Sequence, residues 1–198
     1  MLGFATTGFC EEEKKDKLDL STPKKAYKEF LKTAFAGNAD QLEKCITPAP
    51  KGIDELQKKM IKFTALSYSF FSKMSEKYGD EFKKALPEGS TDSMPKPEDV
   101  DELECEINGD TATLTAKDSD TKTPPIKLKK IDGKWRVELF AEGVPDKRMV
   151  GFLSSMMDQA IKMFEKGHKL IGKEGETAKS ILDALKPSPS MDNDSKEK

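Results

Sequence analysis

The sequence predicts an α+β domain in which N-terminal helices lead into a four-stranded, bent antiparallel sheet, and a long C-terminal helix packs against that sheet. Two observations support this prediction. Between residues 100 and 141 apolar and polar residues alternate, which is the period of a half-buried strand. On either side, at 23–86 and 145–185, apolar residues recur every three or four positions, which is the period of an amphipathic helix.

The composition narrows the class of protein. A chain of 198 residues can bury a sizeable core. Its 34 basic and 36 acidic residues give a net charge of −2, so no cationic field is available for nucleic acid. No apolar run reaches the roughly 20 residues of a transmembrane helix. The three cysteines are far apart and there is one histidine, so we expect no metal and no cofactor.

Residues 1–20 are predicted to be an exported or tethering segment without fixed structure. An apolar stretch ends at Cys10, and a charged tether follows it, as at the start of a mature bacterial lipoprotein. Cys10 is therefore a candidate for lipidation, and we expect a protein of the cell envelope or a secreted one. Against this, no basic region precedes the apolar stretch, and Phe9 stands where a small residue is usual. If translation started upstream of Met1, the apolar stretch would be the end of a longer export signal, and the missing basic region would be explained. The alternative to export is that these residues are the frayed N-terminus of a cytoplasmic protein.

The first half of the folded part is predicted to be helical. A first helix begins at Ser21–Pro23, because a hydroxyl N-cap followed by proline is a strong start signal. It ends at Gly37, and a short second helix covers 39–46. A long amphipathic helix covers 54–86, with a bend expected at Gly79.

Four strands should follow as a meander. The turns are predicted at Asn108–Asp110 and at Asp132-Gly133, where the residues tolerate positive φ. Since side chains alternate between the two faces of a strand, one apolar face is expected. It would be formed by Leu103, Cys105, Ile107, Trp135 and Leu139.

The last long helix begins near Pro145 and carries an apolar arc half its circumference wide. We expect it to dock on the 54–86 helix and on the sheet, with Leu153, Met156, Ala160 and Phe164 as its most buried residues. A break is expected at 172–175, followed by a short apolar patch. Residues 187–198 are polar and predicted to be a disordered tail.

Two segments resemble the nuclear transport factor two-like superfamily, in particular its exported bacterial members. These are 22–46, with its Thr-Pro start and Gly-Asn turn, and Ile131–Leu139, with a Gly-Lys-Trp turn. The resemblance implies that 21–186 form a single cone-like domain, with the helix after 145 appended to it. It also implies an apolar ligand pocket between the first helix, the third helix and the sheet. The pocket candidates are Phe30, Ala34, Phe63, Leu103, Trp135 and Leu139, although Trp135 could equally be a core anchor.

The catalytic groups of that superfamily are not found here. Its isomerases carry a tyrosine seven residues before the turn glycine, where this chain has Phe30, and its dehydratases need two histidines, whereas His168 stands alone. We therefore name no catalytic residue, and an unrecognised carboxylate pair is the alternative. His168 is interpreted as a residue at the edge of an apolar face. Cys45 and Cys105 are interpreted as separate buried thiols, with a disulfide as the alternative.

The sequence thus favours a non-enzymatic protein, monomeric or dimeric, that binds a small apolar ligand or a protein partner through a cone-fold pocket. One alternative is an isomerase-like or cyclase-like enzyme that uses the same pocket. The other is a structural module whose pocket is filled by side chains.

Overall fold

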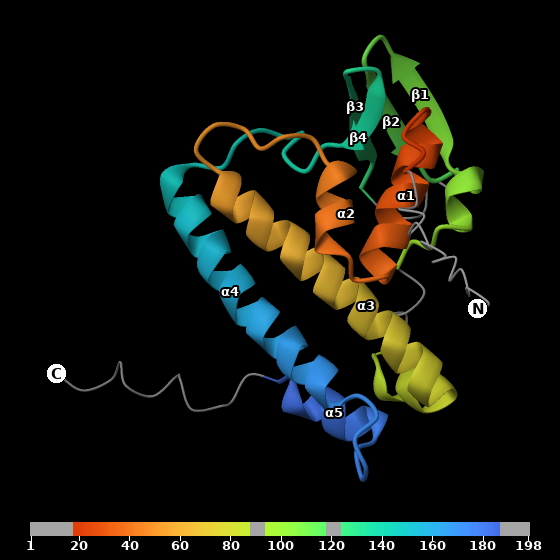
Figure 1. Cartoon of the computed structure of the whole chain (residues 1–198), viewed down its shortest axis with the longest axis vertical. Helices are drawn as coiled ribbons and strands as arrows, with labels where there is room; N and C mark the ends of the chain where they lie inside the picture. Colours follow the sequence, from red (N-terminus) through yellow and green to blue (C-terminus); the bar gives the residue numbers. More distant parts are fainter. Residues whose placement is uncertain (1–17, 88–93, 118–123, 187–198) are drawn as a thin grey trace, which may run out of the picture.

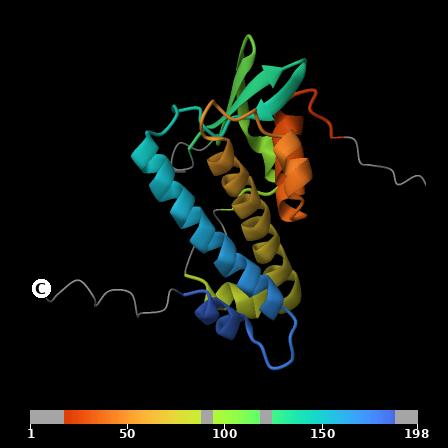
Figure 2. The same cartoon turned by 60° about the vertical axis from the view of Figure 1, so that its left-hand side comes forward.

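Helix α3 (Asp54–Ala85) is the element on which the other α-helices pack. The structure is a computed structural model that describes residues 18–87, 94–117 and 124–186 (Figure 1). Helices α1 (Pro23–Phe35) and α2 (Ala39–Lys44) lie on one side of α3, and α4 (Lys147–Leu170) and α5 (Ala178–Ala184) contact it elsewhere (Figures 1 and 2). Of the predicted segment 1–20, residues 1–17, which include Cys10, lie outside the described residues, as does the predicted tail 187–198. Leu20, at the end of the first segment, is buried, and its carbonyl oxygen accepts from the Trp135 amide at 2.9 Å.

The N-terminal helices begin where the sequence predicts, and each ends two residues before its predicted end, at Phe35 and at Lys44. The hydroxyl of Thr22 accepts a hydrogen bond from the Lys25 amide at 3.3 Å, and Pro23 opens α1. Gly37, with φ of 71°, ends the helix in a conformation that favours glycine. Asn38 then caps α2 by accepting from the Gln41 amide at 3.0 Å.

The bend expected in α3 is present at Gly79. Its φ of 48° and ψ of −119° are not helical, so the last turn takes a new direction. That turn carries Phe82, which is 1% exposed. The bend therefore folds the end of α3 back onto the body of the protein.

The α+β class and the four-stranded antiparallel sheet are confirmed. A short 3₁₀ helix, η1 (Asp99–Glu102), leads into β1 (Glu104–Asn108), β2 (Thr111–Thr115), β3 (Ile126–Ile131) and β4 (Lys134–Val137). The strands pair in sequence order, as a meander does. The β3–β4 turn uses Asp132 and Gly133, both with positive φ.

The predicted apolar face has the right phase but the wrong extent. Cys105 pairs with the buried Leu114, so it faces the same side of the sheet. All of β1 is nevertheless exposed, and Ile107 is 56% exposed. The expected burial of Cys105 and Ile107 was wrong because α1 packs on β4 and β2, whereas β1, at the opposite edge of the sheet from β4, is left exposed.

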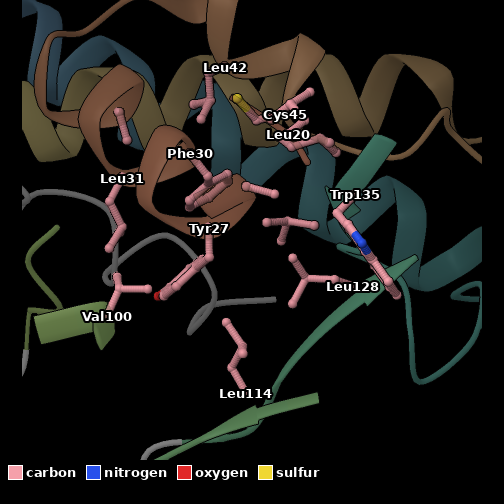
Figure 3. Close-up of a cluster of buried hydrophobic side chains, with 14 of the residues drawn as sticks. Leu20, Tyr27, Phe30, Leu31, Leu42, Cys45, Val100, Leu114, Leu128 and Trp135 are labelled. Carbon is pink, nitrogen blue, oxygen red and sulfur yellow. The ribbon is translucent and has the colours of Figure 1, made fainter. Parts of the chain in front are cut away.

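Two hydrophobic clusters share α3. The first joins α1, α2 and the sheet, and Figure 3 shows its aromatic and aliphatic side chains around Tyr27, Phe30 and Trp135. The second joins the C-terminal half of α3 to α4 and α5, around Phe70 and Ile181. Apolar surface removed from water in both clusters holds the helices and the sheet in place.

Helix α4 docks on α3, as expected, but its most buried positions differ from the prediction. Asp146 caps it by accepting from the Arg148 and Met149 amides at 2.9 Å. Its principal neighbours among the described elements are α3 and α5, and the sheet is not among them. Ile161 and Gly167 are its buried residues, whereas Met156 is 47% exposed.

The closest approach of α4 to α3 is at Gly167. A Cβ atom there would lie 2.7 Å from a ring carbon of Phe70 and 3.1 Å from Leu185. Phe70 is fully buried between the rings of Phe71, Phe164 and His168 and has little room to move. Glycine at 167 is therefore required by this close contact and not by its backbone conformation, which is helical.

None of the helices in the described ranges is long and apolar enough to cross a bilayer.

Candidate functional site

The pocket candidates from the sequence occupy two different places. Phe30, Ala34 and Trp135 are buried within the first cluster (Figure 3), and Leu103 and Leu139 pack against it. Phe63 instead faces α4, and its ring lies 5.7 Å from that of Phe164. The structure therefore brings five of the six together as core and separates Phe63 from them.

Leu139 also lines an apolar groove that the sequence did not predict as such. The groove lies where the end of the sheet and the 138–145 turn meet α3 and α4, and its volume is about 600 Å³. Its apolar walls include Met60, Ile126, Leu139, Phe140, Val144 and Leu153. An ion pair of 2.6 Å between Lys127 and Glu142 also lines it, and the hydrogen bond from Lys127 holds the pKa of Glu142 below its usual value.

Beside this groove, one flank of α4 is apolar and uncovered. Met149, Phe152 and Met156 are 48%, 61% and 47% exposed, and they lie three and four residues apart on one line along the helix. We call these three residues the open flank. Val144, which lines the groove, is 52% exposed and precedes α4.

The open flank exists because α3 covers only one half of the apolar arc. At about 100° per residue, Met156 and Ile161 point in directions roughly 140° apart. Ile161 is 7% exposed and belongs to the covered half. The arc spans about 180°, so a single neighbouring helix cannot cover all of it.

Charges on the two edges of α4 differ. On the edge next to α3, Asp158 pairs with Lys59 at 2.6 Å and Glu165 with Lys62 at 2.7 Å. The hydrogen bond from Lys62 holds the pKa of Glu165 below its usual value. The other edge, next to the open flank, carries Arg148, Lys162 and Lys166, and no acid in the described ranges pairs with them. The flank therefore has a basic border.

Within the part of the chain that the structure describes, Ser69 and His168 form a pair whose residue types suggest catalysis, but the hydrogen bonds of this pair fit a structural role. The Nε2 atom of His168 lies 3.2 Å from the Ser69 hydroxyl and 3.0 Å from the carbonyl oxygen of Leu66. A carbonyl only accepts, so Nε2 must carry a proton and donate to it. It is then unable to act as a base for Ser69, which is 4% exposed. His168 of α4 instead joins that helix to α3 through its contacts with Ser69 and Leu66. The sequence predicts it at the edge of an apolar face, which agrees with this role.

The two cysteines in the described residues are free, as expected. Cys45 is fully buried, and burial raises the pKa of its thiol to about 11. Cys105 is exposed on the edge strand, which corrects its predicted burial. Within the described ranges, no group of three or more His, Cys, Asp or Glu side chains is arranged to hold a metal ion.

Comparisons with protein-family models, with curated proteins and with solved structures found no match to this chain.

Proposed function

We propose that this chain is a non-enzymatic binding protein that holds an amphipathic helix of another protein on the open flank and the adjoining groove. The observation that carries the proposal is the uncovered half of the α4 arc, with Phe152 61% exposed. Contiguous exposed apolar surface of this kind marks interaction sites in soluble proteins. Folding does not require it, because α3 already covers the other half.

The shape of the surface favours a helix over a small molecule. Small ligands prefer concave sites that enclose most of their surface, whereas the flank is convex and continues into an open groove. From Met149 to Met156 it runs about 11 Å along α4 at 1.5 Å per residue. Two helical turns of a partner can lie along that length, in the way amphipathic helices dock in apolar grooves. Methionine side chains adapt to such partners easily.

The basic border indicates the charge of the partner. Arg148 and Lys162 would face acidic residues that flank the apolar stripe of the docking helix. Such contacts speed association and fix register more than they add affinity, so binding should weaken moderately as salt is raised.

Site-specific photo-crosslinking in cells that express the protein tests this proposal. A photoreactive amino acid at Phe152 should capture one partner protein, and the same amino acid at Glu106, which is exposed on β1, should not capture that protein. The purified partner should then bind the wild type at least about tenfold more tightly than Met156→Asp, because a carboxylate would enter the apolar contact. Sedimentation of the purified chain and binding to anionic vesicles complete the test. If the flank mediates self-association or vesicle binding, or if Met156→Asp binds the partner as well as the wild type, the proposal fails.

The resemblance to the nuclear transport factor two-like superfamily belongs to the same proposal. It is supported by the order of the elements, in which two helices and a long third helix precede an antiparallel meander. In this proposal the side chains of Phe30, Ala34 and Trp135 fill the inner pocket of the cone. The protein then binds its partner on the open flank and not in that pocket.

Export to the cell envelope is also part of the proposal and depends on Cys10 and the charged residues after it. Metabolic labelling with an alkyne-tagged fatty acid should mark the wild type and not a Cys10→Ser variant. Cys105→Ser is the matched control and should keep the label.

A further inference from the structure

The two edges of the sheet differ in how the chain covers them. At the β4 edge, the amide of Trp135 donates to the carbonyl oxygen of Leu20 at 2.9 Å. Further along β4, Val137 donates to Cys45 and accepts from Thr47. β1 lies at the other edge (Figure 1), and among the described residues its backbone pairs with β2 alone. The described chain therefore closes the β4 edge and leaves the β1 edge open.

An open edge strand presents its hydrogen-bonding groups in a regular pattern. In an antiparallel ladder, every second residue of the edge strand directs its N–H and C=O groups away from the neighbouring strand. β1 contains five residues, Glu104–Asn108, which span about 17 Å. An extended segment of similar length can pair with these groups and add a fifth strand to the sheet.

One face of β1 continues an apolar row that crosses the whole sheet. Its members are cross-strand neighbours on β4, β3, β2 and β1, namely Val137, Leu128, Ala112 and Ile107. The first three are at most 6% exposed, whereas Ile107 is 56% exposed. The row thus belongs to the core over three strands and ends uncovered on the fourth. An apolar side chain on an added strand would lie next to Ile107 and cover part of it.

The opposite face of β1 is acidic. Glu104 and Glu106 lie opposite Thr115 and Thr113, and neither forms an ion pair with another described residue. The next residue in the row of Glu106 is Lys127, two strands away, or about 10 Å. A basic residue on an added strand would be at half that distance from a carboxylate that has no other cation beside it.

The same charges disfavour a second copy of the chain as the added strand. Antiparallel pairing of two β1 strands about Cys105 sets Glu104 against Glu106, and pairing about Glu106 sets that residue against itself. Like charges directly opposite each other destabilise a sheet, and charged edge strands commonly prevent such self-pairing. A segment in which basic and apolar residues alternate is attracted instead. β3, with Lys-Leu-Lys at 127–129, shows that the sheet accommodates this alternation.

We propose that the open edge of β1 binds an extended segment of another protein in which lysine or arginine alternates with apolar residues. Backbone hydrogen bonds join the segment to β1. Its basic side chains face Glu104 and Glu106, and an apolar side chain covers Ile107. This site lies on the sheet and does not depend on the open flank or on the partner proposed for it.

Nitrogen-15 NMR of the full chain with short peptides tests the site. The probe is the peptide Thr-Lys-Val-Lys-Val-Lys-Thr with both ends blocked, and the control peptide has glutamate in place of each lysine. The lysine peptide should shift the amide signals of β1 saturably. The glutamate peptide should bind at least about tenfold more weakly, because two attractive cross-strand pairs become repulsive.

Two methylated forms of the lysine peptide separate strand pairing from charge attraction alone. The N–H groups of its lysines and those of its valines point to opposite edges of the extended peptide. Only one of the two sets can face β1. N-methylation of that set should abolish the saturable shifts, and N-methylation of the other set should preserve them. Equal binding of the two methylated peptides would overturn the proposal.

Charge reversal in the protein provides a second test. The double variant Glu104→Lys, Glu106→Lys should bind the glutamate peptide more tightly than the lysine peptide. Glu174→Lys, at an exposed position outside the sheet, is the matched control and should keep the wild-type preference. The fluorescence of the single tryptophan shows whether each variant is folded. If the double variant does not fold, Glu106→Lys alone should reduce the preference for the lysine peptide severalfold.

Three results would overturn the proposal in these experiments. The first is the lack of saturable shifts on β1, including the case in which only α4 responds. The second is a peptide preference that charge reversal leaves unchanged. The third is a dimer in sedimentation that the charge-reversed variant does not form, because a second copy would then occupy the edge.

Discussion

Introducing a carboxylate at two positions of α4 tests which side of this helix faces α3. Met156→Asp places the charge on the open flank, where 47% of the methionine is exposed. Ile161→Asp places the same charge in the covered half, where 7% of the isoleucine is exposed. The two changes are five residues apart on one helix, so propensity and length effects are nearly the same.

The expected costs differ severalfold. Full burial of a methionine or isoleucine side chain contributes about 1.5–3 kcal/mol, so the half-buried Met156 accounts for roughly 1 kcal/mol. Aspartate adds a helix-propensity penalty of about 0.5 kcal/mol, which brings Met156→Asp to about 1–2 kcal/mol. At Ile161 the lost side chain alone costs about 2–5 kcal/mol, and a buried, unpaired carboxylate adds to it. That total approaches the entire stability of an ordinary domain, about 5–15 kcal/mol.

Urea unfolding followed by the fluorescence of the single tryptophan measures both changes. Met156→Asp should shift the midpoint modestly with an unchanged slope, and Ile161→Asp should be largely unfolded without denaturant. Equal destabilisation by the two variants, or a folded and stable Ile161→Asp, would show that the orientation of α4 is not the one described.

Four further outcomes follow from the packing. Gly167→Ala should lower stability by about 1–3 kcal/mol through overpacking, partly offset by helix propensity, whereas Gly151→Ala, with no atom within 4 Å of the new Cβ, should raise it by up to about 1 kcal/mol. Both are measured by urea unfolding, and shifts of the same sign would contradict the packing at 167. Trp135→Ala should cost about 3–5 kcal/mol in calorimetry, and a melting temperature within a degree or two of the wild type would exclude a core role. In a Cys10→Ser background, iodoacetamide followed by mass spectrometry should modify Cys105 much faster than Cys45, and equal rates would show that Cys45 is accessible. Burial raises the pKa of the Cys45 thiol to about 11, so the folded state favours the neutral thiol. The free energy of unfolding should therefore be constant below the ordinary thiol pKa and should fall as the pH rises from there toward 11. Cys45→Ala should remove this fall from the pH dependence of stability.

Local signals explain why so much of the fold could be predicted. The Thr22-Pro23 start, the Gly37-Asn38 turn and the break at Gly79 each depend on the conformational preferences of one or two residues. Sheet order followed in the same way from short turns, since strands joined by tight turns pair with their neighbours.

Features that depend on distant elements were predicted less well. Alternation places Cys105 and Ile107 on the correct face, but it does not tell how far a covering helix extends, and β1 is exposed while α1 packs on β4 and β2. The candidate site shows the same limit. Phe63 and Trp135 are both apolar residues of amphipathic elements, and only the three-dimensional path of α3 shows that Trp135 lies in the first cluster while Phe63 faces α4.

The arc of α4 shows what periodicity can and cannot determine. Its width, about half the circumference, predicts that more than one surface must cover it, and the expectation was that α3 and the sheet would both do so. In the structure α3 covers the half that contains Ile161, whereas Met149, Phe152 and Met156 in the other half are exposed and the sheet is not a principal neighbour of α4. Met149, Phe152 and Met156 are each about half exposed, so polar residues there would destabilise the fold much less than at Ile161. Folding therefore explains only part of the apolar character of these three positions. Exposed apolar surface is unfavourable in water, and a partner that covers it would supply the missing second surface.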